Sequence, residues 1–284
     1  MLHPKSTLNC NGQLIDLSEP IIMGVLNVTP DSFFDGGKYK NGEALLQQVG
    51  KMISAGAMII DVGGMSSRPG AEIINVSEEL SRVIPIIKQI KEHFPTIIIS
   101  IDTVRSEVAR QSVAAGASII NDISAGSIDD QMFETVAELN VPYILMHMQG
   151  KPENMQQHPD YQDVTKNVLD FFIEKIGELR ELGVKDIILD PGFGFGKTIQ
   201  HNYQLLQNFA IFKILDLSLL AGISRKSMIY KVLDSTPEEA LNGTTVLNTL
   251  ALERGAKILR VHDVKEAEET ITLWKQLNQE PKKL

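Results

Sequence analysis

The chain has 284 residues, enough for one large domain or two small ones, and its 43% hydrophobic and 22% charged residues are typical of a folded enzyme rather than a disordered or membrane protein. The formal net charge of −9 argues against general nucleic-acid binding, which usually requires a basic surface, but it allows a local basic pocket for an anion. The single cysteine, Cys10, and the lack of an apolar run typical of a signal peptide or a membrane span favour a cytoplasmic protein without disulfides.

Residues 1–19 predict an N-terminal β-hairpin. The segment TLNCNGQLIDL, residues 7–17, has two short strand-like runs around Asn11-Gly12, a pair that favours a type I′ turn. We expect this hairpin to cap one mouth of the unit that follows. No linker or low-complexity segment interrupts the chain, so we expect residues 1–284 to form a single domain with a frayed tail at residues 278–284.

A pattern of glycine, buried strand and polar residue recurs along the rest of the chain. A glycine ends an amphipathic stretch, and a short apolar run then leads into a polar side chain, at residues 56–61, 116–121, 255–260 and, more loosely, 183–190. Similar apolar runs occur at residues 21–26, 96–101, 142–146 and 218–223. Eight buried strands that alternate with helices predict a parallel sheet. Their number and the chain length favour a single (β/α)₈ TIM-type barrel of the α/β class, with an open doubly wound sheet as the alternative.

A polar side chain follows each of these strands. In chain order the residues are Asn27, Asp61, Asp102, Asn121, His147, Asp190, Ser224 with Lys226, and Arg260 with His262. Because the carboxyl ends of the strands open at one face of a parallel barrel, we expect these residues to converge in one pocket. A single aspartate at a strand end is as often a cap as a site residue, but eight such positions together favour a functional rim.

The charges at this rim indicate a ligand with two unlike ends. Asp102 and Asp190 can accept paired N–H groups from a planar heterocycle, while Asn121 can both donate and accept. Positive charge and donors for an anion come from Arg260, His262, Arg68 and Lys226. A heterocycle with a guanidine-like edge and a phosphate tail would satisfy both groups.

Two long loops follow the first two strands, at residues 27–42 and 63–76. Both are rich in Gly, Ser, Pro and Asp and are longer than minimal connections. We expect them to act as lids over the same mouth, the alternative being that they simply turn the chain.

The stretch DPGFGFGKT, residues 190–198, only superficially resembles a loop that binds nucleotide phosphates. Three residues, not four, separate Gly192 from Gly196, and Pro191 stands where a glycine amide is needed. These differences exclude a nucleotide site of that kind. We expect Lys197 to be a solvated surface charge, and we expect the same surface location for His3, His93, His158 and His201.

Several long motifs follow one another between residues 21 and 266: MGVLNVTPDSF, DGG, IIDVGG, SSRPG, IIND, LMH, ILDPGFGFGK, SRKS and RVHDV. Together they resemble the dihydropteroate synthase family of bacterial folate biosynthesis. The resemblance implies a TIM-type barrel, usually a homodimer, that joins 6-hydroxymethyl-7,8-dihydropterin diphosphate to p-aminobenzoate with the help of Mg²⁺ and releases diphosphate.

The resemblance also implies roles for individual residues. The pterin would lie among Asp102, Asn121, Asp190, Lys226, Met146 and Gly222. The diphosphate would be bound by Asn27, Arg260 and His262, with Asn27 also holding Mg²⁺ through its amide oxygen. The p-aminobenzoate would be surrounded by Phe33, Ser66, Ser67, Pro69, Phe195 and Ser227, its carboxylate near Ser227 and the helix start there. Catalytic roles would extend to Arg68 and Asp35. Met65 and Ser67 stand where many relatives carry Glu and Thr, a departure that bears on loop closure and aryl-amine binding.

From this resemblance we expect a dissociative substitution. Diphosphate leaves first, and a cation forms at the exocyclic carbon of the pterin, where Asp102 and Asp190 supply negative charge. The aryl amine attacks as a neutral group and requires no strong base. Two alternatives are a pterin-dependent methyltransferase, which would not need the two long loops, and a non-catalytic pterin-binding subunit, which would not need Asn27, Lys226 or Arg260.

Overall fold

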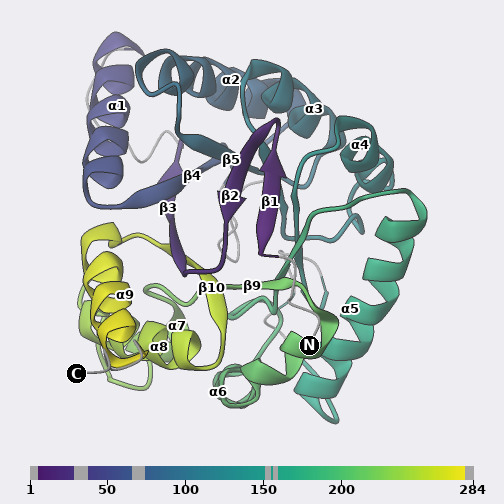
Figure 1. Ribbon diagram of the computed structural model, residues 1–284, viewed down its shortest axis with the longest axis vertical. Coiled ribbons are helices and arrows are strands. Elements are labelled where there is room, and N and C mark those ends of the chain that lie inside the picture. The colour runs from purple at the N-terminus through teal and green to yellow at the C-terminus, as the bar shows by residue number, and fades with distance from the viewer. Residues whose placement is uncertain (1–5, 29–37, 66–73, 151–154, 156–158, 279–284) are drawn as a thin grey trace, which may run out of the picture.

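The computed structural model describes residues 6–28, 38–65, 74–150, 155 and 159–278, with the backbone alone for residues 38–41 (Figure 1). Eight parallel strands form a closed barrel: β3 (Ile21–Asn27), β4 (Ala57–Gly63), β5 (Ile98–Asp102), β6 (Ile119–Asp122), β7 (Tyr143–Met146), β8 (Ile187–Asp190), β9 (Ser218–Ala221) and β10 (Ala256–Val261). Strand β10 pairs with β3, with Ile258 opposite Ile21, and this pairing closes the barrel. The expected TIM-type barrel is confirmed, and the open-sheet alternative is wrong.

Helices surround the barrel on its outside, as Figure 1 shows. They are α1 (Lys38–Ser54), α2 (Val76–His93), α3 (Ser106–Ala115), α4 (Met132–Leu139), α5 (Val164–Glu181), α6 (Ile199–Gln207), the 3₁₀ helix η2 (Phe209–Leu215), α7 (Ser227–Tyr230), α8 (Leu241–Glu253) and α9 (Val264–Asn278). The sequence sets where several of them begin. Asn75 caps α2 by accepting from Glu78 N, and Asp163 caps α5 by accepting from Thr165 N and Lys166 N. Within the described residues, none of these helices is both long enough and apolar enough to cross a bilayer.

Two apolar layers follow from the alternation of side chains along each strand. Outward residues such as Ile22, Ile60 and Ile99 pack against the helices. Inward residues form a separate cluster inside the barrel: Met23, Ile59, Ile98, Ile119, Ile144, Ile188, Leu220 and Ile258. Each fully buried side chain of this kind contributes about 1.5–3 kcal/mol relative to an exposed one.

The N-terminal hairpin closes the mouth at which the strands begin. Strands β1 (Thr7–Cys10) and β2 (Gln13–Asp16) are antiparallel, and Asn11 and Gly12 between them have φ angles of 54° and 90°, as a type I′ turn requires. Their buried side chains, Cys10 among them, join the inner barrel cluster. Burial raises the pKa of the Cys10 thiol to about 12. The predicted capping hairpin is therefore confirmed, and it leaves the carboxyl ends of the strands as the mouth for a site.

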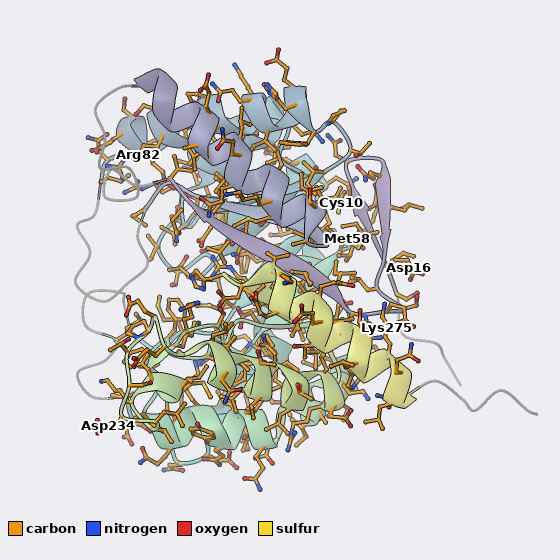
Figure 2. The ribbon with its side chains drawn as sticks, turned by 90° about the vertical axis from the view of Figure 1, so that its left-hand side faces the viewer. Cys10, Asp16, Met58, Arg82, Asp234 and Lys275 are labelled. Carbon is orange, nitrogen blue, oxygen red and sulfur yellow. The ribbon has the colours of Figure 1, made fainter. Side chains whose placement is uncertain are left out.

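The two ends of the barrel are thus different. Figure 2 shows the hairpin with Cys10 at one end and Arg82 at the other. Arg82 Nη1 donates to the carbonyl oxygen of Gly64, directly after β4, over a distance of 2.9 Å.

Candidate active site

The site begins two residues beyond the inner apolar cluster on most strands. Because side chains alternate along a strand, the next inward position after Ile59 is Asp61, and the next after Ile258 is Arg260. The same step leads to the inward residues Asn121, Met146, Asp190 and Gly222. At Asp61, Asn121, Asp190 and Arg260 the barrel interior therefore changes within one layer from branched apolar side chains to polar ones.

An arginine connects two carboxylates across this polar layer. Arg260 Nε lies 2.7 Å from Asp61 Oδ2, and Arg260 Nη2 lies 2.7 Å from Asp102 Oδ2. Asn121 Nδ2 donates to the same Asp61 oxygen at 3.0 Å. Asp61 is completely buried, and its second oxygen has no hydrogen-bond partner among the described residues. Four residues from strands β4, β5, β6 and β10 are therefore joined in one network.

Burial and neighbouring charges set the protonation of this network. Burial raises the pKa of Asp102 to about 7, although Arg260 acts in the opposite direction. Burial also disfavours the charge of Arg260, but Asp61 and Asp102 outweigh that effect and raise the pKa of the guanidinium. Donors from a bound heterocycle would therefore add to the effect of Arg260 and favour the ionised form of Asp102.

A second charged pair comes from β8 and the segment after β9. A methyl group on Gly222 would lie 3.7 Å from Asp190 Oδ2 and 3.9 Å from Lys226 Nζ, so both groups face the same space. Burial lowers the pKa of Lys226 to about 8, with Asp190 opposing the shift. Burial raises the pKa of Asp190, while Lys226 and Arg260 act against that rise. Asp190 therefore lies within the field of both basic residues.

Apolar side chains lie beside these charges. Met146 packs with Val104 and Ile123, and the half-buried Phe195 and Met65 contact this cluster. The ammonium of Lys226 lies 4.5 Å from the centre of the Phe195 ring and donates to Phe193 O. A flat ring bound here would contact apolar surface on its face and charged groups at its edge.

His262 and Asn27 lie at the ends of neighbouring strands. His262 Nδ1 lies 3.1 Å from Ser224 Oγ, and its backbone N–H donates to the same oxygen. Burial and then the charge of Arg260 lower the pKa of His262 to about 4, so the imidazole is neutral at pH 7, although the residue as a whole is exposed. A methyl group on Gly63 would lie 3.8 Å from both Asn27 Oδ1 and Asp102 Oδ2.

The prediction for Lys197 is wrong. The residue is only 3% exposed, and its ammonium donates to the carbonyl oxygens of His147, Gly192 and Phe195. The chain after Asp190 folds back over its own lysine, which the sequence motif alone does not indicate. Of the histidines, His93 is exposed as expected, whereas His201 is half-buried and completes a capping box at the start of α6.

Several predicted site residues lie outside the described residues. They are Phe33, Asp35, Ser66, Ser67, Arg68 and Pro69, together with most of both long loops, His3 and His158. Ser227 is described and begins α7, which has only four residues, so a helix dipole contributes little there.

Asp61 and His147 received no role from the sequence although both were recognised at strand ends. The alternation of side chains could have identified Asp61, because it stands two residues after an inward isoleucine. In contrast, Asp122 follows the inward Asn121 directly and faces outward, where Tyr143 Oη donates to it at 2.8 Å.

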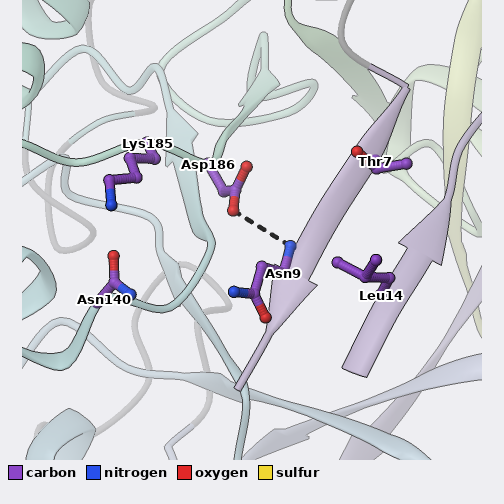
Figure 3. A pocket seen from close by; sticks show the side chains of 6 residues that line it. All are labelled: Thr7, Asn9, Leu14, Asn140, Lys185 and Asp186. Atoms are coloured by element: carbon purple, nitrogen blue, oxygen red, sulfur yellow. Dashed lines mark hydrogen bonds between the residues drawn. The ribbon is translucent and has the colours of Figure 1, made fainter. Parts of the chain in front are cut away.

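A shallow hollow next to the hairpin is not a competing site. Figure 3 shows its lining by Thr7, Asn9, Leu14, Asn140, Lys185 and Asp186. Asp186 Oδ2 accepts the backbone N–H of Asn9 at 3.1 Å and so anchors the hairpin. This hollow lies at the mouth where the strands begin, away from the charged network.

Comparisons with known proteins agree with this arrangement. Residues 23–262 match the family described as pterin binding enzyme. The dihydropteroate synthase of Escherichia coli strain K12 is 48% identical over 266 residues, which cover 93% of this chain and 94% of that protein. The structure of Yersinia pestis dihydropteroate synthase with a sulfonamide drug complex has a TM-score of 0.90 at 42% identity, covering 95% of this chain and 98% of that chain. Dihydropteroate synthase from Xanthomonas albilineans in complex with 7,8-dihydropteroate has a TM-score of 0.87 at 37% identity, covering 97% of this chain and 100% of that chain.

Proposed function

The chain belongs to the pterin binding enzyme family, and from that premise we propose that it catalyses the dihydropteroate synthase reaction. It is a transferase that condenses 6-hydroxymethyl-7,8-dihydropterin diphosphate with p-aminobenzoate to give 7,8-dihydropteroate and diphosphate. The observation that carries this proposal is the bridge from Arg260 to Asp61 and Asp102 in the same mouth as Asp190 and Lys226. The Xanthomonas albilineans relative, which covers nearly the whole chain, binds the product 7,8-dihydropteroate.

The pterin occupies the polar layer between the strands. Asp102 and Asp190 accept N–H groups from the edge of the ring, and Asn121 pairs with a neighbouring donor and acceptor. Lys226 donates to a ring acceptor near Gly222, and Met146 packs against the ring face. The burial of both aspartates supports this assignment, since their raised pKa values are countered by N–H donors from such a ring.

The diphosphate binds nearer the rim. Arg260 supplies a permanent positive charge, and the neutral His262 donates one N–H to a phosphate oxygen rather than transferring a proton. Arg260 is already bonded to two carboxylates, so its orientation is fixed before an anion arrives.

Mg²⁺ fits the oxygen atoms at this position. Asn27 Oδ1 lies 3.8 Å from where a methyl group on Gly63 would be, and it would supply a protein oxygen; Asp102 Oδ2 lies at the same distance but already accepts from Arg260. Mg²⁺ is commonly held by one or two protein oxygens together with phosphate and water. Among the described residues no group of three or more His, Cys, Asp or Glu side chains could enclose a metal, which suits an ion held largely by substrate phosphates. When bound, the ion would neutralise charge on the leaving diphosphate.

The reaction proceeds by departure of diphosphate before the amine attacks. As the bond from the exocyclic carbon to the phosphate oxygen breaks, the electron pair leaves with the diphosphate and positive charge spreads into the pterin. Asp102 and Asp190 are fixed within the barrel and stabilise that charge without reorganisation. The amine of p-aminobenzoate forms the new carbon–nitrogen bond and then loses its proton to water.

The p-aminobenzoate binds at the rim beside Phe195 and Ser227. Phe195 offers a ring face next to Lys226, and the Ser227 hydroxyl can donate to the carboxylate of the aryl amine. We assign the remaining contacts to Phe33, Ser66, Ser67 and Pro69, and catalytic support to Arg68 and Asp35.

We further propose that residues 1–284 act as a single domain in a cytoplasmic homodimer that binds no nucleic acid. Exposed apolar side chains on neighbouring elements support the dimer, among them Ile214 of η2, Val246 of α8 and Leu273 of α9.

Release of diphosphate tests the proposed function. The protein is incubated with the pterin diphosphate, with and without p-aminobenzoate and with and without Mg²⁺. Stoichiometric formation of 7,8-dihydropteroate and diphosphate only when all components are present is the expected result. Tight pterin binding without release would instead identify a non-catalytic pterin-binding protein.

A further inference from the structure

Lys197 holds the loop between β8 and α6, residues 191–198, from beneath. Its ammonium lies 3.0 Å from Gly192 O, 3.0 Å from Phe195 O and 3.2 Å from His147 O, and also 2.9 Å from His147 Nδ1. An ammonium has three hydrogens to donate and no acceptor. These four acceptors therefore use all of its donors, although the side chain is almost completely buried.

Side chains supply most of the hydrogen bonds that this loop makes. The Gly196 carbonyl accepts from Tyr161 Oη at 2.8 Å, and the Gly194 N–H donates to Asn202 Oδ1 at 2.7 Å. The Phe193 carbonyl accepts from Lys226. Buried backbone groups require partners, and a loop without regular structure obtains them from elsewhere in the fold. Lys197 adds two further contacts, to the Gly192 and Phe195 carbonyls.

At two positions the loop lies so close to residues 147–149, which follow β7, that only glycine fits. A methyl group on Gly192 would be 2.0 Å from His147 O, and one on Gly196 would be 2.3 Å from Gln149 O. The Lys197 ammonium therefore lies where residues 147–149 and the loop are in close contact, and it is hydrogen-bonded to both.

His147 is the neutral partner in this arrangement. Burial and then the nearby charge of Lys197 hold the pKa of His147 well below its usual range. The imidazole therefore accepts from the ammonium through Nδ1, and its ring packs edge-on against Phe171 with ring centres 4.9 Å apart.

The two loop carbonyls that Lys197 binds belong to residues that also contact the site: Phe195 through its ring, and Gly192 through its N–H, which donates to Asp190. The Phe195 carbonyl contacts Lys197, while the ring of the same residue lies against Lys226 and the apolar cluster around Met146. The Gly192 carbonyl contacts Lys197, while the Gly192 N–H donates to Asp190 Oδ1 at 2.8 Å. Hydrogen bonds link Lys197 to Asp190 only through Gly192. In contrast, the Phe195 carbonyl is bonded to Lys197 itself and to no other described residue.

We propose that Lys197 is a positioning residue for the aryl-amine side of the site, because it fixes the backbone of Phe195 and so holds that ring beside Lys226. The inference rests on the proposed function, which assigns the Phe195 ring to p-aminobenzoate. Lys197 touches neither substrate: it bonds the Phe195 backbone directly but acts on Asp190 only through Gly192 and as a nearby charge, so we expect its main effect on the binding of the aryl amine.

The test compares Lys197→Met with Lys91→Met. Lys91 also donates to two backbone carbonyls, at 2.9 Å to Pro95 O and 3.0 Å to Ile97 O, but at the opposite mouth of the barrel. Methionine keeps the length of the stem and removes the donors. Lys197→Met should raise the KM for p-aminobenzoate by about tenfold or more, the effect of losing hydrogen bonds from a charged donor, with a change below about twofold in the KM for pterin diphosphate. Lys91→Met should leave both KM values unchanged.

A double variant separates positioning from general stability. If Lys197 acts through the Phe195 ring, Lys197→Met adds little to the rise in KM that Phe195→Ala already causes. Unchanged KM values in Lys197→Met, equal rises for both substrates, or full additivity with Phe195→Ala would each overturn the inference.

A readout on the free protein keeps this test independent of the reaction. Trp274 is the single tryptophan of the chain, so Phe195→Trp in a Trp274→Phe background reports on position 195 alone. Adding Lys197→Met should shift its emission to longer wavelength, and an unchanged spectrum counts against the inference. If the wild-type protein did not form 7,8-dihydropteroate but the Lys197→Met substitution still shifted the emission, only the proposed function would be contradicted.

Discussion

Arg260 and Asp61 are separated by 199 residues in the sequence, yet their side chains form a 2.7 Å hydrogen bond inside the barrel. The bond exists because β10 pairs with β3 and β3 pairs with β4, which brings the last strand within one strand of Asp61. Asp61 also accepts from Asn121, so one buried oxygen orients both the side chain that we assign to the anion and one that we assign to the pterin.

Asp61→Ala should destabilise the protein by roughly 3–5 kcal/mol, because it leaves the largely buried guanidinium of Arg260, whose side chain is 19% exposed, without one of its two carboxylates. Urea unfolding measures this loss. Glu79→Ala is the matched control, since Glu79 is equally buried and pairs with Arg105 between the helices. Both variants should lose stability, but only Asp61→Ala should weaken pterin binding; equal pterin affinities in the two variants would contradict the role of Asp61.

Asp102→Asn should lower turnover by far more than it weakens pterin binding. In the proposed mechanism this carboxylate stabilises charge that develops only as diphosphate leaves, so its loss should affect the transition state more than the bound substrate. A reduction in kcat on the order of a hundredfold, with pterin affinity changed by less than about tenfold, is expected. Steady-state rates and pterin titration provide the comparison, and parallel losses in both would exclude this role.

Removal of Mg²⁺ by a chelator should abolish diphosphate release, and added Mg²⁺ should restore it. Asn27→Ala should raise the Mg²⁺ concentration required for half-maximal activity by roughly tenfold or more, because one protein oxygen is lost. Asn278→Ala, at the exposed end of α9, serves as the control and should leave the requirement unchanged. Identical Mg²⁺ dependence in wild type and Asn27→Ala would place the ion elsewhere.

The stability of wild type relative to Lys197→Met should rise with pH between about 7 and 10.5. Burial lowers the pKa of Lys197 from 10.5 to about 7, so the unfolded chain binds more protons than the folded one in this range. Asp190 and Lys226, the other charged groups that influence Lys197, titrate in both proteins. Urea unfolding of both proteins at about pH 6, 8 and 10 measures the difference, and parallel curves would show that Lys197 does not titrate on unfolding.

Much of the fold could be predicted because the sequence repeats one local pattern. Each strand is a short apolar run that begins after a helix and ends in a polar residue, and parallel pairing then brings those ends together regardless of their separation along the chain. This is why the sequence alone predicts that Asp102, Asn121, Asp190, Lys226 and Arg260 lie at one mouth.

Other features depend on the orientation of groups that a motif does not encode. Asp61 stands two residues after an inward isoleucine and Asp122 stands three residues after one, and only this parity separates an inward carboxylate from an outward one. The environment of Lys197 depends on where three loop carbonyls point, which is a property of the folded backbone. Its partners therefore could not be read from the spacing of glycines.

The hairpin that seals the mouth where the strands begin also imposes a sequence of events on the reaction. With that end filled by Leu8, Cys10, Ile15 and Leu17, both substrates and both products must pass through one entrance. On the proposed assignments, a pterin at the buried Asp190 would have to enter before an aryl amine that rests against the half-buried Phe195. Closure of one end of the barrel by the hairpin would thereby favour ordered rather than random binding of the two substrates.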